Sequence, residues 1–166
     1  MKRDPALVSL SRDHHQALFV AQRLRRATTQ TADEARAAFL AYWEGHGRAH
    51  FRLEEEVLLP AYAAHGDPHH PLVAQVLCDH VAIRHRADAL AFNGASLVTA
   101  LHELGDRLAD HVRLEERQLF RSSRARCRPR SWPQWPLCWN RLSTRLPIDS
   151  RQAGRAIRSR SHAVRT

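Results

Sequence analysis

Four segments within the first 120 residues carry apolar side chains at alternating spacings of three and four residues. This spacing places the apolar side chains along one face of an α-helix, which a folded chain buries against other helices. Capping residues or prolines mark the expected starts of these helices, at Asp4-Pro5, Thr31 to Asp33, Pro71 and Ser96. Connections of roughly four to eight residues favour antiparallel neighbours. We therefore expect an all-α protein, an antiparallel up-down-up-down four-helix bundle.

Histidine and glutamate interrupt all four of these apolar faces. Each face has a histidine near its middle, and two faces also carry a glutamate; these residues are His14, His50, Glu54, His80, His111 and Glu115. An ionised glutamate in a helix core is costly unless another charge compensates it. A metal cation is one such compensation, so the pattern indicates a metal site inside the bundle.

The histidines and glutamates belong to an internal repeat. Residues 50–55 (HFRLEE) and 111–116 (HVRLEE) match at five of six positions, and each places His and Glu four residues apart on one helix face. A pair Asp13-His14 precedes the first copy, and a pair Asp79-His80 precedes the second. Imidazole nitrogen and carboxylate oxygen are suitable ligands for iron, manganese or zinc. The repeat predicts that both halves deliver ligands to one place.

With these residues in view, the chain resembles the hemerythrin-like (HHE cation-binding) domain family. The resemblance covers about residues 7–120 and rests on the order His, HxxxE, His, HxxxE and on the phrase HFRLEEEVLLPAY. It implies two non-haem iron ions as cofactor, with manganese or zinc possible, bridged by two carboxylates and capped by histidines. Carried over position by position, the implied metal ligands are His14, His50, Glu54, His80, His111 and Glu115.

The sequence departs from the oxygen-carrying members of that family at one ligand position. Those proteins use a fifth histidine one turn before the ligand of the third helix, and this chain has Val76 there. His46 and His85 are candidates to complete the coordination. His15 is adjacent to the first stripe, so it is an alternative to His14 as the ligand of the first helix.

The resemblance implies a protein that binds or senses dioxygen, nitric oxide or peroxide, or that handles iron. The alternative is an enzyme, either an iron-dependent peroxidase or catalase-like enzyme or a protein that repairs damaged iron clusters. The missing fifth histidine favours redox or peroxide chemistry over reversible oxygen transport. No dedicated general acid or base is evident, so a metal- and ligand-binding protein is expected ahead of a dedicated enzyme.

The charge of the chain divides near Phe120. Residues 1–120 hold 14 basic and 16 acidic residues, whereas residues 121–166 hold 12 arginines and one acidic residue. Three of the four tryptophans also lie in this last stretch, and helical periodicity ends there. We expect residues 121–166 to be an irregular, disordered basic tail; phosphate contacts and base stacking by such a tail are the less favoured interpretation.

The remaining features favour a cytoplasmic protein. The N-terminus lacks the apolar stretch of a secretory signal, and no apolar run is long enough to span a membrane. The odd number of cysteines and the absence of CxxC argue against a disulfide framework, and Cys78 is expected to be buried or inert. Glu55 and Glu116 are expected to face solvent or pair with arginines. The sequence indicates no oligomeric state.

Overall fold

The protein is described by a computed structural model, which covers residues 5–64, 66–91 and 96–120. The predicted tail at residues 121–166 lies outside these described residues. The described residues form helices and connections without any β-strand, which confirms the prediction of an all-α fold.

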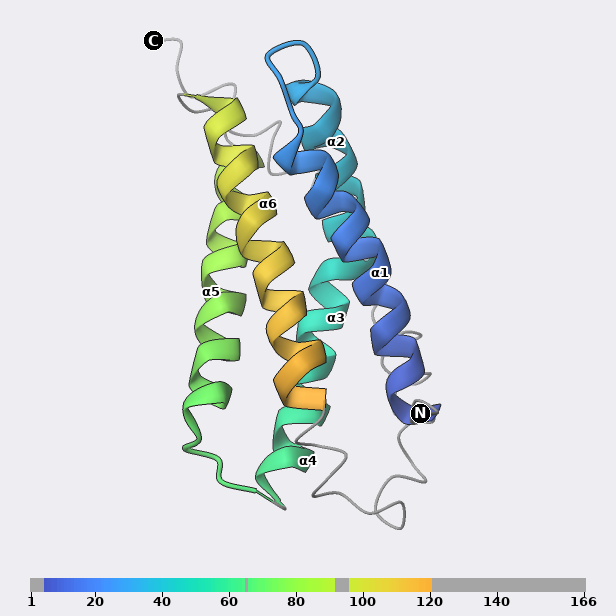
Figure 1. Cartoon of the computed structure of the whole chain (residues 1–166), viewed down its shortest axis with the longest axis vertical. Helices are drawn as coiled ribbons and strands as arrows, with labels where there is room; N and C mark the ends of the chain where they lie inside the picture. The colour runs from blue at the N-terminus through green and yellow to red at the C-terminus, as the bar shows by residue number, and fades with distance from the viewer. Residues whose placement is uncertain (1–4, 65, 92–95, 121–166) are drawn as a thin grey trace, which may run out of the picture.

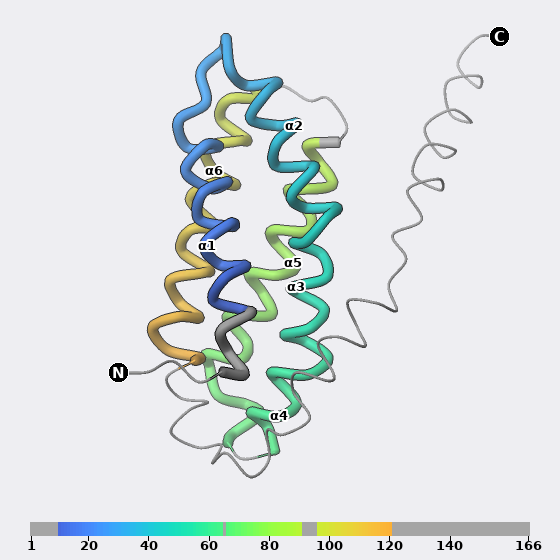
Figure 2. Tube along the Cα trace, turned by 90° about the vertical axis from the view of Figure 1, so that its right-hand side faces the viewer, coloured from blue at the N-terminus to red at the C-terminus, as the bar shows by residue number. Residues whose placement is uncertain are grey.

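The helical elements form four long rods that pack side by side (Figure 1; Figure 2). The second rod continues through two π-helical turns, η1 and η2. The fourth rod ends in another π-helical turn, η3. The first and third rods are α1 (Pro5–Arg25) and α5 (Pro71–Ala91). The second rod consists of α2 (Ala32–Tyr42), η1 (Trp43–Gly47), α3 (Arg48–Leu53), η2 (Glu54–Leu58) and α4 (Leu59–Ala63). The fourth rod consists of α6 (Leu97–Leu114) and η3 (Glu115–Leu119).

The last helix begins where the sequence predicts, but the predicted side-chain cap is absent. Ser96 directly precedes α6, yet its backbone is left-handed, with φ 56°, and its side chain makes no capping bond to the helix backbone. Its hydroxyl instead donates to Thr99 Oγ1 at 2.7 Å. Ser96 therefore precedes the helix without the side-chain cap that the sequence suggested.

Helices α1 and α6 approach each other closely at Gly105. A Cβ atom at this position would lie 2.8 Å from the carbonyl oxygen of Ala21 and 3.0 Å from Leu24 Cβ. Contacts this short are excluded for real side chains, so glycine allows α6 to approach the backbone of α1. This contact aligns the helices that carry His14 and His111.

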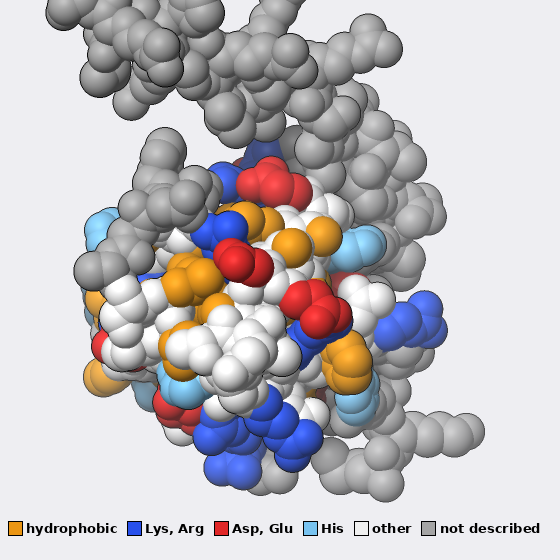
Figure 3. Space-filling view, turned by 90° about the horizontal axis from the view of Figure 1, so that it is seen from above, with side chains coloured by type: hydrophobic (Ala, Val, Ile, Leu, Met, Phe, Trp, Pro, Cys, Tyr) orange, Lys and Arg blue, Asp and Glu red, His pale blue; other side chains and the backbone are white. Residues whose placement is uncertain are grey.

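Two apolar clusters fill the interior of the bundle. The larger is built around Phe39, Trp43 and Leu104, and the smaller around Leu58 and Tyr62. On every rod, the histidines and glutamates of the repeat lie in sequence between members of the larger and the smaller cluster. The end of the bundle that carries the α1–α2 connection shows basic and acidic side chains next to each other (Figure 3).

One face of α5 is more exposed than its sequence pattern suggested. Cys78, expected to be buried, is exposed, and Leu77 and Val81 beside it are 39% and 66% exposed. The cysteine therefore lies on the outer face of the helix rather than in the core. None of the described helices combines the length and the apolar character needed to cross a membrane.

Candidate metal centre

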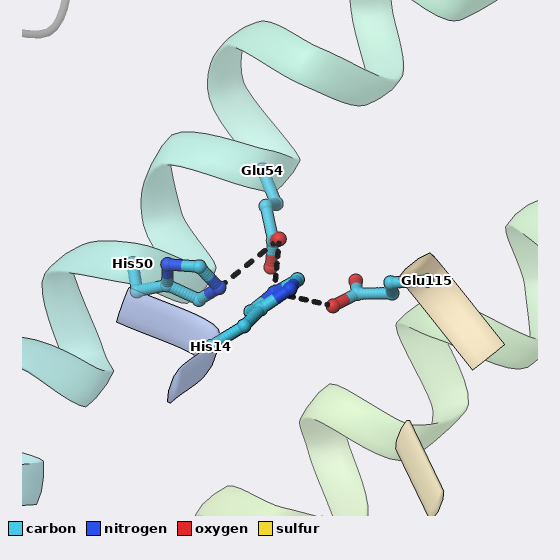
Figure 4. A group of neighbouring side chains, drawn as sticks. All are labelled: His14, His50, Glu54 and Glu115. Carbon is cyan, nitrogen blue, oxygen red and sulfur yellow. Dashed lines mark ion pairs between the residues drawn. The ribbon is translucent and has the colours of Figure 1, made fainter. Parts of the chain in front are cut away.

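The six residues of the sequence motif come together in the middle of the bundle. The structure buries all of them, with exposed fractions between 0% and 4%; they are His14 on α1, His50 on α3, Glu54 on η2, His80 on α5, His111 on α6 and Glu115 on η3. Each of the four rods supplies at least one of these side chains. Figure 4 shows His14, His50, Glu54 and Glu115 pointing toward one another.

Both glutamates are the first residues of π-helical turns. The backbone N–H of Leu59 donates to the carbonyl of Glu54, and the N–H of Phe120 donates to the carbonyl of Glu115, each five residues earlier. Such turns are wider than an α-helical turn and are frequent at functional sites. The two turns occupy equivalent positions of the repeat, so the halves present their carboxylates in the same way.

The Nε2 atoms of the histidines converge on these two carboxylates. Glu54 lies against three of them, at 3.1 Å from His50, 3.3 Å from His80 and 3.7 Å from His14. Glu115 also lies against three, at 3.2 Å from His14, 3.3 Å from His111 and 3.8 Å from His80. Each carboxylate therefore connects histidines from both halves of the repeat.

These side chains form two ligand groups that share both glutamates. One group is His14, His50, Glu54 and Glu115, and the other is Glu54, His80, His111 and Glu115; in each, the ligand atoms lie within 4.8 Å of one another. Within the described chain, both oxygens of each glutamate and the Nε2 atoms of His14, His80 and His111 are buried without a hydrogen-bond partner. Buried polar atoms normally have partners, and these point at a common space, so the donor set fits metal ions.

The charges of the cluster support the same interpretation. Burial disfavours the charged form of His14, but Glu115, Glu116 and Glu54 outweigh it and raise its pKa to about 11. Burial is likewise outweighed by carboxylates at His50, whose pKa rises to about 9, and at His80, whose pKa rises to about 10. The histidines lower the pKa of both Glu54 and Glu115 despite complete burial. The cluster thus holds positive charge between two carboxylates, as a cation would.

His111 differs from the other three histidines. Burial lowers the pKa of His111 and is the largest effect; Glu115 raises the pKa and His80 lowers it, and the net shift is downward. The neutral imidazole is the form that binds a metal. His111 is therefore ready to act as a ligand without losing a proton.

A second layer of carboxylates faces the Nδ1 atoms of all four histidines. Glu55 lies 2.7 Å from His80, and Glu116 lies 3.0 Å from His14. Asp13 and Asp79 lie farther away, at 3.5 Å from His50 and 3.9 Å from His111. A carboxylate at the outer nitrogen of a metal-binding histidine orients the ring and strengthens it as a donor.

Sequence reasoning missed the role of this second layer. Glu55 does pair with an arginine, as expected, but it is only partly exposed and also contacts His80. The aspartates were noticed only as part of the repeated Asp-His pairs. The repeat itself is the sequence signal for these four carboxylates, because Asp13 is equivalent to Asp79 and Glu55 is equivalent to Glu116.

The other histidines considered from sequence do not join the cluster. His15, the alternative to His14, is exposed, and so are His46 and His85, the candidates for completing the coordination. Val76, at the position of the family's fifth histidine, is fully buried in the smaller apolar cluster. The side chain of Val76 offers no ligand atom, and His15, His46 and His85 all lie outside the cluster.

Two phenylalanine rings stack on histidines of the cluster. Phe51 stacks on His80 with ring centroids 3.9 Å apart, and Phe120 stacks on His14 at 5.2 Å. Each ring comes from the half of the repeat opposite to the histidine that it covers. The stacking fixes the ring planes and excludes water from these faces of the cluster.

Comparison with known proteins agrees with this site. Neither the comparison with curated proteins nor that with solved structures gives a match. The family model described as the hemerythrin HHE cation binding domain matches residues 6–122, which include all six residues of the cluster and the four carboxylates behind them. The match spans most of the chain and confirms the resemblance drawn from the repeat. This protein belongs to the hemerythrin HHE cation-binding domain family.

Proposed function

We propose that the chain binds two non-haem iron ions and uses them to bind or sense dioxygen, nitric oxide or peroxide, or to handle iron. The observation that carries this proposal is the pair of ligand groups sharing Glu54 and Glu115. Six inward-facing ligands are too many for one tetrahedral zinc ion, whereas two ions use all of them. Histidine and carboxylate suit iron, and the family of this chain favours a cation in this place.

In this proposal the metal ligands are His14, His50, Glu54, His80, His111 and Glu115. Each ion would take two histidines and one oxygen from each glutamate. Glu116 and Glu55 bond to the Nδ1 atoms of His14 and His80, so the Nε2 atoms of these two histidines remain available to bind metal. Iron supplies redox chemistry and affinity for small oxygen and nitrogen ligands when it is bound.

The remaining residues of the site would exclude water and limit access. Phe120 stacks on His14 and belongs to the same buried apolar cluster as Leu58, Tyr62 and Val76, so apolar side chains lie beside the site. A small uncharged molecule passes between apolar side chains more easily than a charged one, because burial of a charge is costly. This surrounding favours a diatomic ligand or neutral peroxide over a larger polar substrate.

The proposal is tested by purifying the full chain aerobically and measuring its metal content and optical spectrum. We expect about two irons per chain and a near-ultraviolet charge-transfer band. His111→Ala should lose the band and keep about one iron, Glu54→Ala should lose the band and hold both irons more weakly, and the exposed His85→Ala should keep the iron and the band. A chain that holds a single zinc ion, or that takes up no iron anaerobically, would overturn the proposal.

One observation favours the enzymatic alternative, a peroxidase-like activity. Val76 removes a histidine that the oxygen carriers of the family possess, and its buried side chain provides no substitute. A metal ion with fewer protein ligands keeps a position open for reaction. Repeated turnover of peroxide by the iron-loaded chain, absent in His111→Ala, would support the enzyme; uptake of one ligand per centre without turnover would support the binding protein.

We also propose that residues 1–120 form an up-down-up-down bundle, that residues 121–166 form a separate basic tail, and that the chain works in the cytoplasm. Figure 1 supports the order of the helices, since the start of α1 and the end of η3 lie at one end of the bundle and the α1–α2 connection lies at the other. Limited proteolysis should cut first within residues 121–166 and leave a metal-binding fragment of about 120 residues.

A further inference from the structure

The two histidines of one ligand group are each connected to an arginine through a carboxylate. Glu55 contacts His80 at 2.7 Å and receives a forked pair of bonds from Arg84, at 2.7 and 3.0 Å. Asp79 faces His111 at 3.9 Å and receives a bond from Arg107 at 2.8 Å. His80 and His111 belong to the same ligand group.

A second contact connects Arg84 to the same histidine. Its guanidinium lies 5.5 Å from the centre of the Phe51 ring, and Phe51 stacks on His80 at 3.9 Å. Arg84 therefore reaches the neighbourhood of His80 both through Glu55 and through an aromatic ring. Its side chain is 31% exposed, so solvent screens its charge only in part.

The first half of the repeat has different residues at the corresponding positions. The Asp-His pairs are 66 residues apart and the HxxxE motifs 61 residues apart, so Arg84 corresponds to Leu18 and Arg107 to His46. Leu18 carries no charge, and His46 is exposed. Arginine thus occurs at both of these positions in the second half of the chain and at neither in the first.

The physical consequence follows from the role of the carboxylates. A carboxylate at Nδ1 strengthens a histidine as a metal donor because its negative charge stabilises the partial charge on the ring. An arginine bound to that carboxylate is always positive and draws part of that charge away. It also repels a cation at the site, and both effects act in the same direction.

We propose that Arg84 and Arg107 are positioning residues that weaken His80 and His111 as donors and so lower the affinity of this ligand group for a divalent cation. The proposal rests on the proposed metal-binding function. It goes beyond that function by assigning a tuning role to two surface arginines that touch no ligand atom.

Cobalt(II) titration of the metal-free full chain tests this role, followed by visible absorbance and by calorimetry. We expect Arg84→Gln and Arg107→Gln each to bind cobalt at this group roughly tenfold more tightly than the wild type. Arg84→Lys and Arg107→Lys keep the charge and should stay close to the wild type. Arg107 lines a surface groove of about 510 Å³ between α5 and α6, so its replacement leaves the core intact.

Matched arginines on the same helices separate this role from a general charge effect. Arg86 on α5 pairs with Glu103 at 2.7 Å and is 36% exposed; Arg113 on α6 pairs with Asp110 at 2.8 Å and is 44% exposed. Arg86→Gln and Arg113→Gln should shift the cobalt affinity much less than Arg84→Gln and Arg107→Gln. Equal shifts in all four glutamine variants would overturn the proposal.

A double variant assigns the effect to the correct ligand group. In a His111→Ala background, Arg107→Gln should change cobalt binding much less than it does in the wild type, because the histidine is gone and only the direct repulsion of the cation remains. Weaker binding in both the glutamine and the lysine variants would show a merely structural role and would refute the tuning role. A wild-type chain that binds no cobalt would instead refute the metal-binding function itself.

Discussion

At the scale of single residues, protons on the histidines supply the positive charge of the cluster when no metal ion is bound. The raised pKa values of His14, His50 and His80 leave these rings positive at neutral pH, next to two ionised glutamates. Binding of metal ions must displace these protons, because a protonated imidazole has no lone pair to donate. Protons and metal ions therefore compete for the same nitrogen atoms.

This competition predicts how the stability of the metal-free protein depends on pH. The raised pKa values stabilise the fold fully below about 6.5, and that contribution is lost as the pH rises through about 9 to 11. The lowered pKa values of the glutamates stabilise it above 4.5, and that contribution is lost as the pH falls. Burial lowers the pKa of His111, so this residue has the opposite effect on the pH dependence of stability. It is one group against the three histidines whose pKa values are raised.

Thermal melting of the full chain with chelator therefore should give the highest Tm between about pH 4.5 and 6.5 and a falling Tm toward alkaline pH. The metal-loaded protein is the control, because metal ions occupy the same nitrogen atoms and remove this alkaline decline. A metal-free Tm that rises steadily from pH 6.5 to 9 would contradict the protonated cluster.

The carboxylates behind the histidines give a second prediction at this scale. Glu55→Gln removes the charge that faces His80 and should weaken metal binding by about 10- to 100-fold. Glu56→Gln is the matched control, because the neighbouring Glu56 is exposed and bonds only to Arg52 among the contacts that the structure describes. Metal titration by calorimetry distinguishes them, and equal affinities for the two variants would remove Glu55 from the site.

At the scale of helices, the sequence pattern predicted the rods but not their local irregularities. Spacing by three and four residues marked the buried faces, so the starts of α1 and α5 and the burial of the six motif residues were predicted correctly. The π-helical turns at Glu54 and Glu115 were not predicted, because a single widened turn leaves the apolar spacing on either side unchanged. The exposure of Cys78 was also missed, because an apolar residue beside a stripe fits either face.

The packing of α1 against α6 leads to a prediction about two glycines. Gly105→Ala places a methyl group against the backbone of Ala21 and should lower the free energy of unfolding by about 1–3 kcal/mol. Gly45→Ala is the control, because no atom lies within 4 Å of the added methyl group and alanine favours helix by roughly 0.5–1 kcal/mol. Denaturant unfolding of both variants provides the comparison, and equal stability would show that the helices do not approach closely at Gly105.

At the scale of the whole molecule, the repeat determines the site. Each half contributes an Asp-His pair and an HxxxE motif, and the halves pack so that Glu55 reaches His80 and Glu116 reaches His14 across the bundle. The inner residues could be predicted because their types and spacing are those of metal ligands. The crossed outer pairs could not, because they depend on how the rods face each other, which periodicity along one helix does not specify.

In the proposed centre two metal ions share Glu54 and Glu115, and anaerobic iron(II) titration of the metal-free full chain can detect both ions. The wild type should saturate at about two ions per chain, and His111→Ala should retain about one tightly bound ion. Glu54→Gln should weaken both positions together, because it supplies an oxygen to each ligand group. A wild-type chain that saturates at one ion, or a Glu54→Gln variant that binds two ions as tightly as the wild type, would contradict the account.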